Sequence, residues 1–232
     1  MGIDASGAGS CAFAVTIGHL EEQGDVDVAV QDVMRPFMKP ASGKLNLKGV
    51  VREALILAAN YNHIAFAYSD RYAGAWPVQA FEEVAAEMGM TFTLKDPVIQ
   101  RGKETVRLTK SDAFLESAPL FRTGRVRLLD SPTQVRELRN LEARQTEGGR
   151  VKVGKPMVRG ELDDQATALA TMLAMLTNRK RPGGFVSGVV VLHKDFTKST
   201  VGRVVDAAGT RYLGDGRFRT ASGEDYRDPR YG

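Results

Sequence analysis

Carboxylates stand at three separated places in the sequence where oxygen ligands could gather. Asp4 ends the first short strand-like segment, Asp70 closes the run "HIAFAYSD", and Asp163 and Asp164 open "LDDQATALATMLAML". In α/β sheets, ligand sites collect at the carboxyl ends of strands. If the first and fourth strands are neighbours, Asp4 and Asp70 lie side by side. A helix packed across that edge can then present an aspartate pair to both.

Clustered carboxylates have a defined chemistry. Their mutual repulsion raises their pKa values unless cations neutralise them. Mg2+ and Mn2+ prefer oxygen ligands, and two such ions about 3.5–4 Å apart can clamp a phosphodiester, activating a water and stabilising the leaving oxygen. The pattern therefore indicates a metal-dependent nuclease. Each acid also has a purely structural interpretation: Asp4 and Asp70 as turn residues, and Asp163 and Asp164 as helix caps.

The elements that must position these acids follow an α/β order. Alternating or short apolar runs between Gly, Pro and Asp breaks predict strands, whereas apolar residues three and four apart predict helices. The predicted strands are 1–5, 11–19, 26–35, 63–70 and 90–96, with short ones within 125–130 and 150–156. The predicted helices are 45–62, 76–89, 109–124, 131–149 and 163–178. This order predicts a mixed central β-sheet flanked by helices on both faces.

Three segments together resemble the nuclease domain of viral large terminases, the DNA-packaging motor proteins of tailed phages and herpesviruses. "GIDASGAGSCAFAV" resembles the family's first strand and Gly-rich turn, "HIAFAYSDRYAG" its fourth strand and small-residue loop, and "LDDQATALATMLAML" its last acidic motif. Leu162 stands where the family usually has His, so the role of that His is absent or taken elsewhere. The resemblance covers most of 1–178 and implies an RNase H-like fold.

The resemblance also implies roles for the acids. Asp4, Asp70 and Asp164 would bind two Mg2+ or Mn2+ ions, and Asp163 would share or replace the role of Asp164. The implied activity is that of an endodeoxyribonuclease that cleaves double-stranded DNA concatemers during viral genome packaging, in the host cell cytoplasm. The family's other half is an ATPase motor with a phosphate-binding loop, and no such loop occurs here. The implied partners are that motor in the same protein, the portal and the small terminase subunit.

A nuclease needs basic residues around its acids, because phosphate contacts supply most of the non-specific affinity for DNA. Arg71 and Lys110 are the preferred two, by their closeness to the acids in the expected fold. The other predicted DNA contacts are Lys103, Arg107, Arg122, Arg125, Arg179, Lys180 and Arg181. Each of these residues could also be an ordinary solvated surface charge.

Length and charge allow one large domain with an appendage. The chain has 232 residues, and residues 179–232 hold 11 Lys and Arg against 6 Asp and Glu. Such an excess suits a polyanion or an acidic partner, or a solvated tail. We expect an RNase H-like nuclease domain over 1–205 and a basic, Gly-rich, loosely ordered tail over 206–232. The first strand begins almost at residue 1, which suggests a piece of a longer protein.

Several other function classes lack support in the sequence. Cys11 is the single cysteine, which excludes an internal disulfide framework and fits a reducing compartment. No apolar run approaches the ~18–20 residues of a membrane span. His19, His63 and His193 lack metal-ligand spacing such as H-x-x-x-H.

Three alternatives remain open. An actin-like or sugar-kinase-like ATPase also begins with Asp and a Gly-rich turn, but its second phosphate loop has only a faint likeness here, in "VVDAAGT". A Holliday-junction resolvase-like nuclease shares the implied fold. A packaging module that kept the fold and lost activity would not be an enzyme.

Overall fold

The structure, a computed structural model, describes residues 1–5, 13–38, 45–61, 67–68, 76–90, 98–101, 103–157, 161–178, 211–214, 217–219 and 225–227. It divides into two compact units, Met1–His193 and Lys194–Gly232. In the second unit, β10 (Arg211–Gly214), β11 (Arg217–Arg219) and β12 (Asp225–Arg227) form an antiparallel sheet. The domain boundary at 205 and the loosely ordered tail stay predictions, since most of 179–232 lies outside the described residues.

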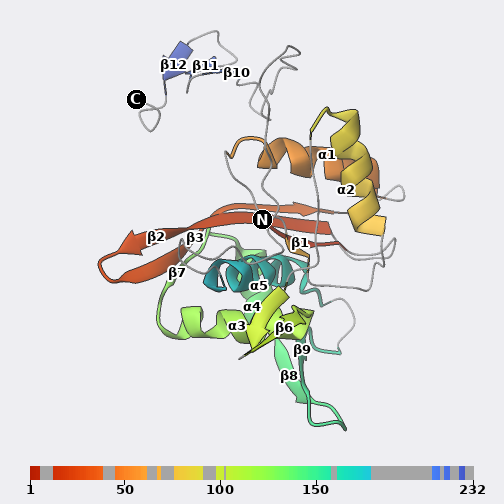
Figure 1. Ribbon diagram of the computed structural model, residues 1–232, viewed down its shortest axis with the longest axis vertical. Coiled ribbons are helices and arrows are strands. Elements are labelled where there is room, and N and C mark those ends of the chain that lie inside the picture. The colour runs from red at the N-terminus through yellow and green to blue at the C-terminus, as the bar shows by residue number, and fades with distance from the viewer. Residues whose placement is uncertain are drawn as a thin grey trace. The chain divides into compact units, whose positions relative to one another are not determined.

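A mixed sheet, five-stranded within the described residues, is the centre of the first unit (Figure 1), in the order β4-β1-β2-β3-β7. These strands are β1 (Gly2–Asp4), β2 (Phe13–Gln23), β3 (Val26–Phe37), β4 (Ala67–Tyr68) and β7 (Val126–Arg127). β1, β2 and β3 are antiparallel neighbours, whereas β4 lies parallel to β1 and β7 lies parallel to β3. The first and fourth strands are therefore neighbours, as the sequence required for an acidic site.

Helices cover both faces of this sheet (Figure 1). On one face lie α1 (Leu47–Ala58) and α2 (Trp76–Glu87), and on the other lies α5 (Asp164–Thr177), with α3 (Lys110–Arg122) and α4 (Pro132–Arg139) beyond it. Because side chains alternate along a strand, Ile3 and Phe13 pack with Phe81 of α2, whereas Ala29 packs with α5. The predicted fold class, a mixed central sheet flanked by helices on both faces, is confirmed.

Helix α5 is buried between the sheet and the helices α3 and α4. Every residue from Asp164 to Ala174 is buried. Leu169 belongs to the cluster on the sheet side, whereas Ala170 packs with Ala113 of α3. An apolar sequence on all sides of a helix suits such a position. Asp163 and Asp164, at the start of this helix, are therefore buried with it.

The helix predicted over 131–149 begins as expected, with Ser131 as its N-cap and Pro132 as its first residue, but the prediction is wrong beyond Arg139. The chain instead forms a hairpin of β8 (Glu142–Gln145) and β9 (Val151–Gly154). Gly148 and Gly149 lie in the hairpin turn, where Gly149 has a φ of 74°. Such a φ favours glycine.

A second hairpin, β5 (Val98–Arg101) with β6 (Glu104–Arg107), was not predicted. Ile99 and the following Leu108 are buried beside α3 and α5. The hairpin thus covers one end of the helical layer. The strand predicted at 90–96 lies almost wholly outside the described residues.

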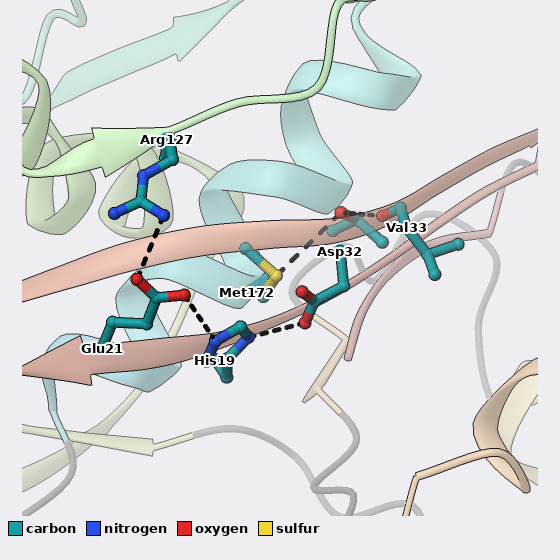
Figure 2. A network of polar contacts seen from close by, with 7 residues as sticks. His19, Glu21, Asp32, Val33, Arg127 and Met172 are labelled. Atoms are coloured by element: carbon teal, nitrogen blue, oxygen red, sulfur yellow. Dashed lines mark hydrogen bonds and ion pairs between the residues drawn. The ribbon is translucent and has the colours of Figure 1, made fainter. Parts of the chain in front are cut away.

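The β2–β3 hairpin carries a polar network on an exposed part of the sheet (Figure 2). Nδ1 of His19 lies 2.8 Å from Oδ2 of Asp32, and its Nε2 lies 3.4 Å from Oε1 of Glu21. Glu21 also pairs with Arg127 of β7 at 3.0 Å. These contacts connect the strand β7 to the hairpin, and they give His19 a structural role away from the site acids.

No helix in the described part of the chain is long and apolar enough to cross a membrane.

Candidate metal centre

Asp4 is the last residue of β1, and its side chain lies on the face of the sheet that α5 covers. Met1, Ile3 and Ala5 pack in the cluster with α1 and α2, so Gly2 and Asp4 face the opposite way. Asp4 is buried, with 3% of its surface exposed. A carboxylate in that position needs a partner or a cation.

A close contact between β1 and α5 fixes the height of the helix over the strand. A Cβ added at Gly2 would lie 2.0 Å from the carbonyl oxygen of Ala168 and 2.7 Å from the backbone nitrogen of Met172. On β2, a Cβ added at Gly18 would meet the Met172 sulfur at 2.6 Å. Gly2 therefore lets the helix backbone lie directly on β1, and Gly18 leaves room for the Met172 side chain on β2.

The same contact determines which aspartate approaches Asp4. Thr16 pairs with Gly2 and Ala14 pairs with Asp4, so Gly18, Gly2 and Asp4 follow one another in one direction along the sheet. Met172 lies over Gly18 and Ala168 lies over Gly2, so the helix runs toward its N-terminus in that same direction. Two strand residues advance about 6.8 Å, and four helix residues advance about 6 Å. Asp164 therefore lies one helical turn beyond the Gly2 contact, over the end of β1 that carries Asp4.

Asp163 has different neighbours. Its Oδ2 lies 2.9 Å from Nζ of Lys110 on α3 and accepts a hydrogen bond of 2.9 Å from the backbone nitrogen of Lys155. Although Asp163 occupies the N-cap position of α5, its side chain makes no capping hydrogen bond. The structural interpretation of this side chain as a helix cap is therefore wrong, because Lys110 and Lys155 hold the carboxylate away from the helix end.

Glu137 of α4, which sequence reasoning missed, lies at the start of α5. Its Oε2 accepts a hydrogen bond of 2.9 Å from the backbone nitrogen of Ala166, and only 3% of its surface is exposed. Burial, together with the nearby charges of Asp164 and Asp163, raises the pKa of Glu137 to about 7, against the lowering effect of hydrogen bonds from the backbone of Ala166 and Gln165. Negative charge is thus concentrated at this helix end.

One signal in the sequence could have pointed to Glu137. Ser131, Gln134 and Glu137 are spaced by three residues, which places them along one side of a short helix. Gln134 and Glu137 are both buried. Arg136 and Arg139 beside them gave the segment the appearance of an exposed helix, and polar residues carry no apolar periodicity to correct it.

Asp70 and Arg71 lie outside the described residues. β4 ends at Tyr68, opposite Ile3 of β1, so the strand that leads to Asp70 is beside the strand that carries Asp4. Among the described residues, no group of three or more His, Cys, Asp or Glu side chains is arranged to hold a metal ion. Of the predicted ligands, Asp4 and Asp164 are buried and supply oxygen donors of the kind that Mg2+ and Mn2+ prefer, whereas Asp163 is paired with Lys110.

The predicted DNA contacts are dispersed over the described structure. Lys110 is ion-paired with Asp163. Lys103 and Arg122 are exposed, whereas Arg107 and Arg125 are half-buried. Lys110 and Arg122 lie at opposite ends of α3, about 18 Å apart at the helical rise of 1.5 Å per residue. They therefore cannot bind the same phosphate group. Residues 179–181, with Arg179, Lys180 and Arg181, lie outside the described residues.

Comparison with known proteins identifies the fold. No family model and no curated protein matches this sequence. The crystal structure of the HK97 bacteriophage large terminase superposes with a TM-score of 0.54 at 16% identity, over 75% of this chain and 38% of that chain. This chain shares its fold with a phage large terminase. The chain thus matches well under half of the HK97 protein's length.

A second solved structure is similar at a lower score. The large terminase nuclease from thermophilic phage G20c aligns with a TM-score of 0.43 and 16% identity, over 74% of this chain and 90% of that one. The resemblance to large terminases that the acidic motifs carry is confirmed as a likeness of fold by the HK97 superposition.

Proposed function

We propose that this chain is a metal-dependent endodeoxyribonuclease that cleaves double-stranded DNA during viral genome packaging. The observation that carries the proposal is the contact of Gly2 with Ala168, which brings the start of α5 over the end of β1. Two buried carboxylates, Asp4 and Asp164, thereby come from segments far apart in the sequence to one edge of the sheet. The phage terminase fold adds support to this interpretation.

The acids have distinct roles in this proposal. Asp4, Asp70 and Asp164 would hold Mg2+ or Mn2+, and Asp163, paired with Lys110, supports the position of the helix start. When bound, two such ions activate a water and stabilise the leaving oxygen of a phosphodiester. Residues of this chain orient the carboxylates and exclude bulk water: Gly2 admits the helix backbone, and Asp4 and Asp164 are buried, where an ionised carboxylate is unfavourable without a cation beside it.

The biological partners follow from the same proposal. The substrate is double-stranded DNA, in the form of genome concatemers inside the host cell cytoplasm. The ATPase motor, the portal and the small terminase subunit are the proposed protein partners. Arg71, Lys103, Arg107, Arg122, Arg179, Lys180 and Arg181 are the proposed phosphate contacts, and Lys110 joins them only if its bond to Asp163 exchanges for a phosphate.

A plasmid assay tests the proposal. Supercoiled plasmid is incubated with the chain and Mn2+ or Mg2+, with and without EDTA, beside Asp4→Asn and Asp164→Asn. Asp25→Asn, in the exposed turn between β2 and β3, is the matched control. Nicking that needs the metal, and that both site variants but not the control abolish, supports the nuclease. Intact plasmid together with ATP hydrolysis would overturn it, and a strong preference for branched DNA would favour a resolvase.

A further inference from the structure

The side chain of the N-cap residue of α5 does not accept a hydrogen bond from the N–H groups of the first turn. The first N–H groups of a helix have no partner within the helix, and the N-cap side chain ordinarily accepts one of them. Here Asp163 occupies that position without a capping bond, because its carboxylate lies with Lys110 and the Lys155 nitrogen. An acceptor from elsewhere is therefore needed in this buried place.

Glu137 supplies that acceptor from a neighbouring helix. Its carboxylate accepts the N–H of Ala166 at 2.9 Å, and Ala166 is two residues after Asp164, in the first turn. A negative group at this helix end also interacts favourably with the helix dipole. Glu137 thus does for α5 what an N-cap residue does, but across a helix–helix contact.

The helix that carries Glu137 is itself fixed to the sheet by buried amides. Gln31 of β3 and Gln134 of α4 exchange two hydrogen bonds, of 3.1 and 3.2 Å. The same Gln31 accepts a bond from the Leu129 nitrogen and donates one to Thr16 of β2. At the other side, the Ser131 hydroxyl donates to the side chain of Gln165 at 3.3 Å. This set of bonds gives Glu137 a fixed place relative to β2 and β3.

Two constraints therefore determine where Asp164 lies. The contact of Gly2 with Ala168 sets the height of α5 over β1, and the bond from Ala166 to Glu137 holds the helix end. Asp164 is the first residue of the helix, so it moves first if that end frays. We propose that Glu137 is a positioning residue, which caps α5 in place of Asp163 and holds Asp164 over Asp4. This inference rests on the proposed function for its consequence in metal binding.

Three substitutions separate capping from other roles of a carboxylate. Glu137→Gln keeps an acceptor oxygen at the same reach, Glu137→Asp keeps the charge but shortens the side chain, and Glu137→Ala removes both. Glu147→Gln, an exposed glutamate in the β8–β9 turn, is the control. Amide hydrogen exchange is measured on the metal-free proteins, and Mn2+ affinity is measured by calorimetry.

The proposal predicts a specific ranking. In the Ala and Asp variants, exchange of the Gln165 and Ala166 amides rises about fivefold or more, as expected for a lost cap, while amides in the second half of α5 keep their protection. Mn2+ binding weakens about tenfold in the same two variants, a typical effect for a group that orients a metal ligand. The Gln variant and the control stay within about threefold of the native chain in both measurements.

Other results overturn the proposal. Equal loss of Mn2+ affinity in the Gln and Ala variants would indicate that Glu137 is a direct metal ligand. Retained affinity in the Asp variant would indicate that the charge of the side chain, and not its length, is what Mn2+ binding requires. Unchanged exchange at Ala166 in the Ala variant would exclude the cap. If the native chain binds no Mn2+ and cuts no DNA, the proposed function fails, whereas the exchange rates, which need neither metal nor DNA, still decide whether Glu137 caps the helix.

Discussion

The carbonyl oxygen of Ala168 lies so close to the Cα of Gly2 that an added Cβ would approach it to 2.0 Å. Real Cβ atoms do not come so near a backbone oxygen, so Gly2→Ala must push α5 away from β1. Overpacking of this kind costs about 1–3 kcal/mol. We expect the free energy of unfolding, measured by urea denaturation, to fall by that amount. We also expect the rate of DNA cleavage to fall, because Asp164 moves with the helix away from Asp4.

Gly148→Ala is the control for this prediction, since nothing lies within 4 Å of a Cβ added there and its φ is not positive. It should leave both stability and cleavage unchanged. A Gly2→Ala chain as stable and active as the native one would mean that α5 is not held at the height that brings Asp164 over Asp4.

The pair of Lys110 and Asp163 makes a separate prediction about stability. The Asp163 side chain is 7% exposed and that of Lys110 is 25% exposed. Lys110→Met would leave a buried carboxylate without its cation, and we expect a loss of about 2–4 kcal/mol in the free energy of unfolding. Adding Asp163→Asn to Lys110→Met should restore part of the loss, because the uncompensated charge is then removed.

The comparison residue is Lys48, whose side chain is 64% exposed beside Glu83 and Glu87. Lys48→Met should cost about 1 kcal/mol or less, as surface ion pairs do. If Lys110 instead serves chiefly as a DNA contact, Lys110→Met will weaken DNA binding in a salt-dependent way and leave stability unchanged, which would contradict the structural role.

Part of this arrangement could be predicted from the sequence because it depends on local patterns. The apolar run after Asp164 predicts a buried helix, whereas the adjacency of the first and fourth strands was only a condition for the acidic site, which the pairing of β4 with β1 meets. The partner of Asp163 could not be predicted, since Lys110 lies far from it in sequence and had been assigned to DNA. Glu137 was missed for the same reason: its surroundings are created by contacts of α4 with α5 and β3.

The β8–β9 hairpin shows the other limit of the sequence prediction. The segment after Arg139 contains good helix formers, and its Glu and Arg residues fit a helix surface as well as a strand. Tertiary contacts decide between them, since the hydroxyl of Ser111 on α3 accepts the N–H of Val153 in β9 at 3.0 Å. Propensity is a weak prior where such contacts exist.

The raised pKa of Glu137 makes stability depend on pH in a definite direction. Its pKa is about 7 in the folded chain against 4.5 for an ordinary glutamate, so the folded state binds more protons between those values. Stability from this group is therefore greatest at low pH and is lost as pH rises from about 4.5 through 7. The charges of Asp164 and Asp163 act on it in the same direction as burial.

The measurement is a difference between two proteins, so that other titrations cancel. Urea denaturation of the native chain and of Glu137→Gln, both in EDTA, is compared at pH 5 and pH 8. The native chain should lose about 2–3 kcal/mol relative to the variant over this interval. A constant difference would show that Glu137 titrates normally, and a change of opposite sign would mean that its charged form is favoured by folding.

Asp163 and Asp164 are adjacent in sequence, but their neighbours predict opposite responses to metal. Asp164→Asn should lower metal-dependent cleavage by about 100-fold or more and abolish stabilisation by Mn2+, which for the native chain is about 2.7 kcal/mol at 100 times the dissociation constant. Asp163→Asn should keep most of that stabilisation, because its carboxylate is bound to Lys110 and the Lys155 nitrogen, and should lower cleavage by about 10-fold to 100-fold through misplacement of the helix end. Thermal denaturation with and without Mn2+ measures the first effect, and plasmid nicking measures the second. If Asp163→Asn loses the Mn2+ stabilisation and Asp164→Asn keeps it, the two aspartates have been assigned in the wrong order.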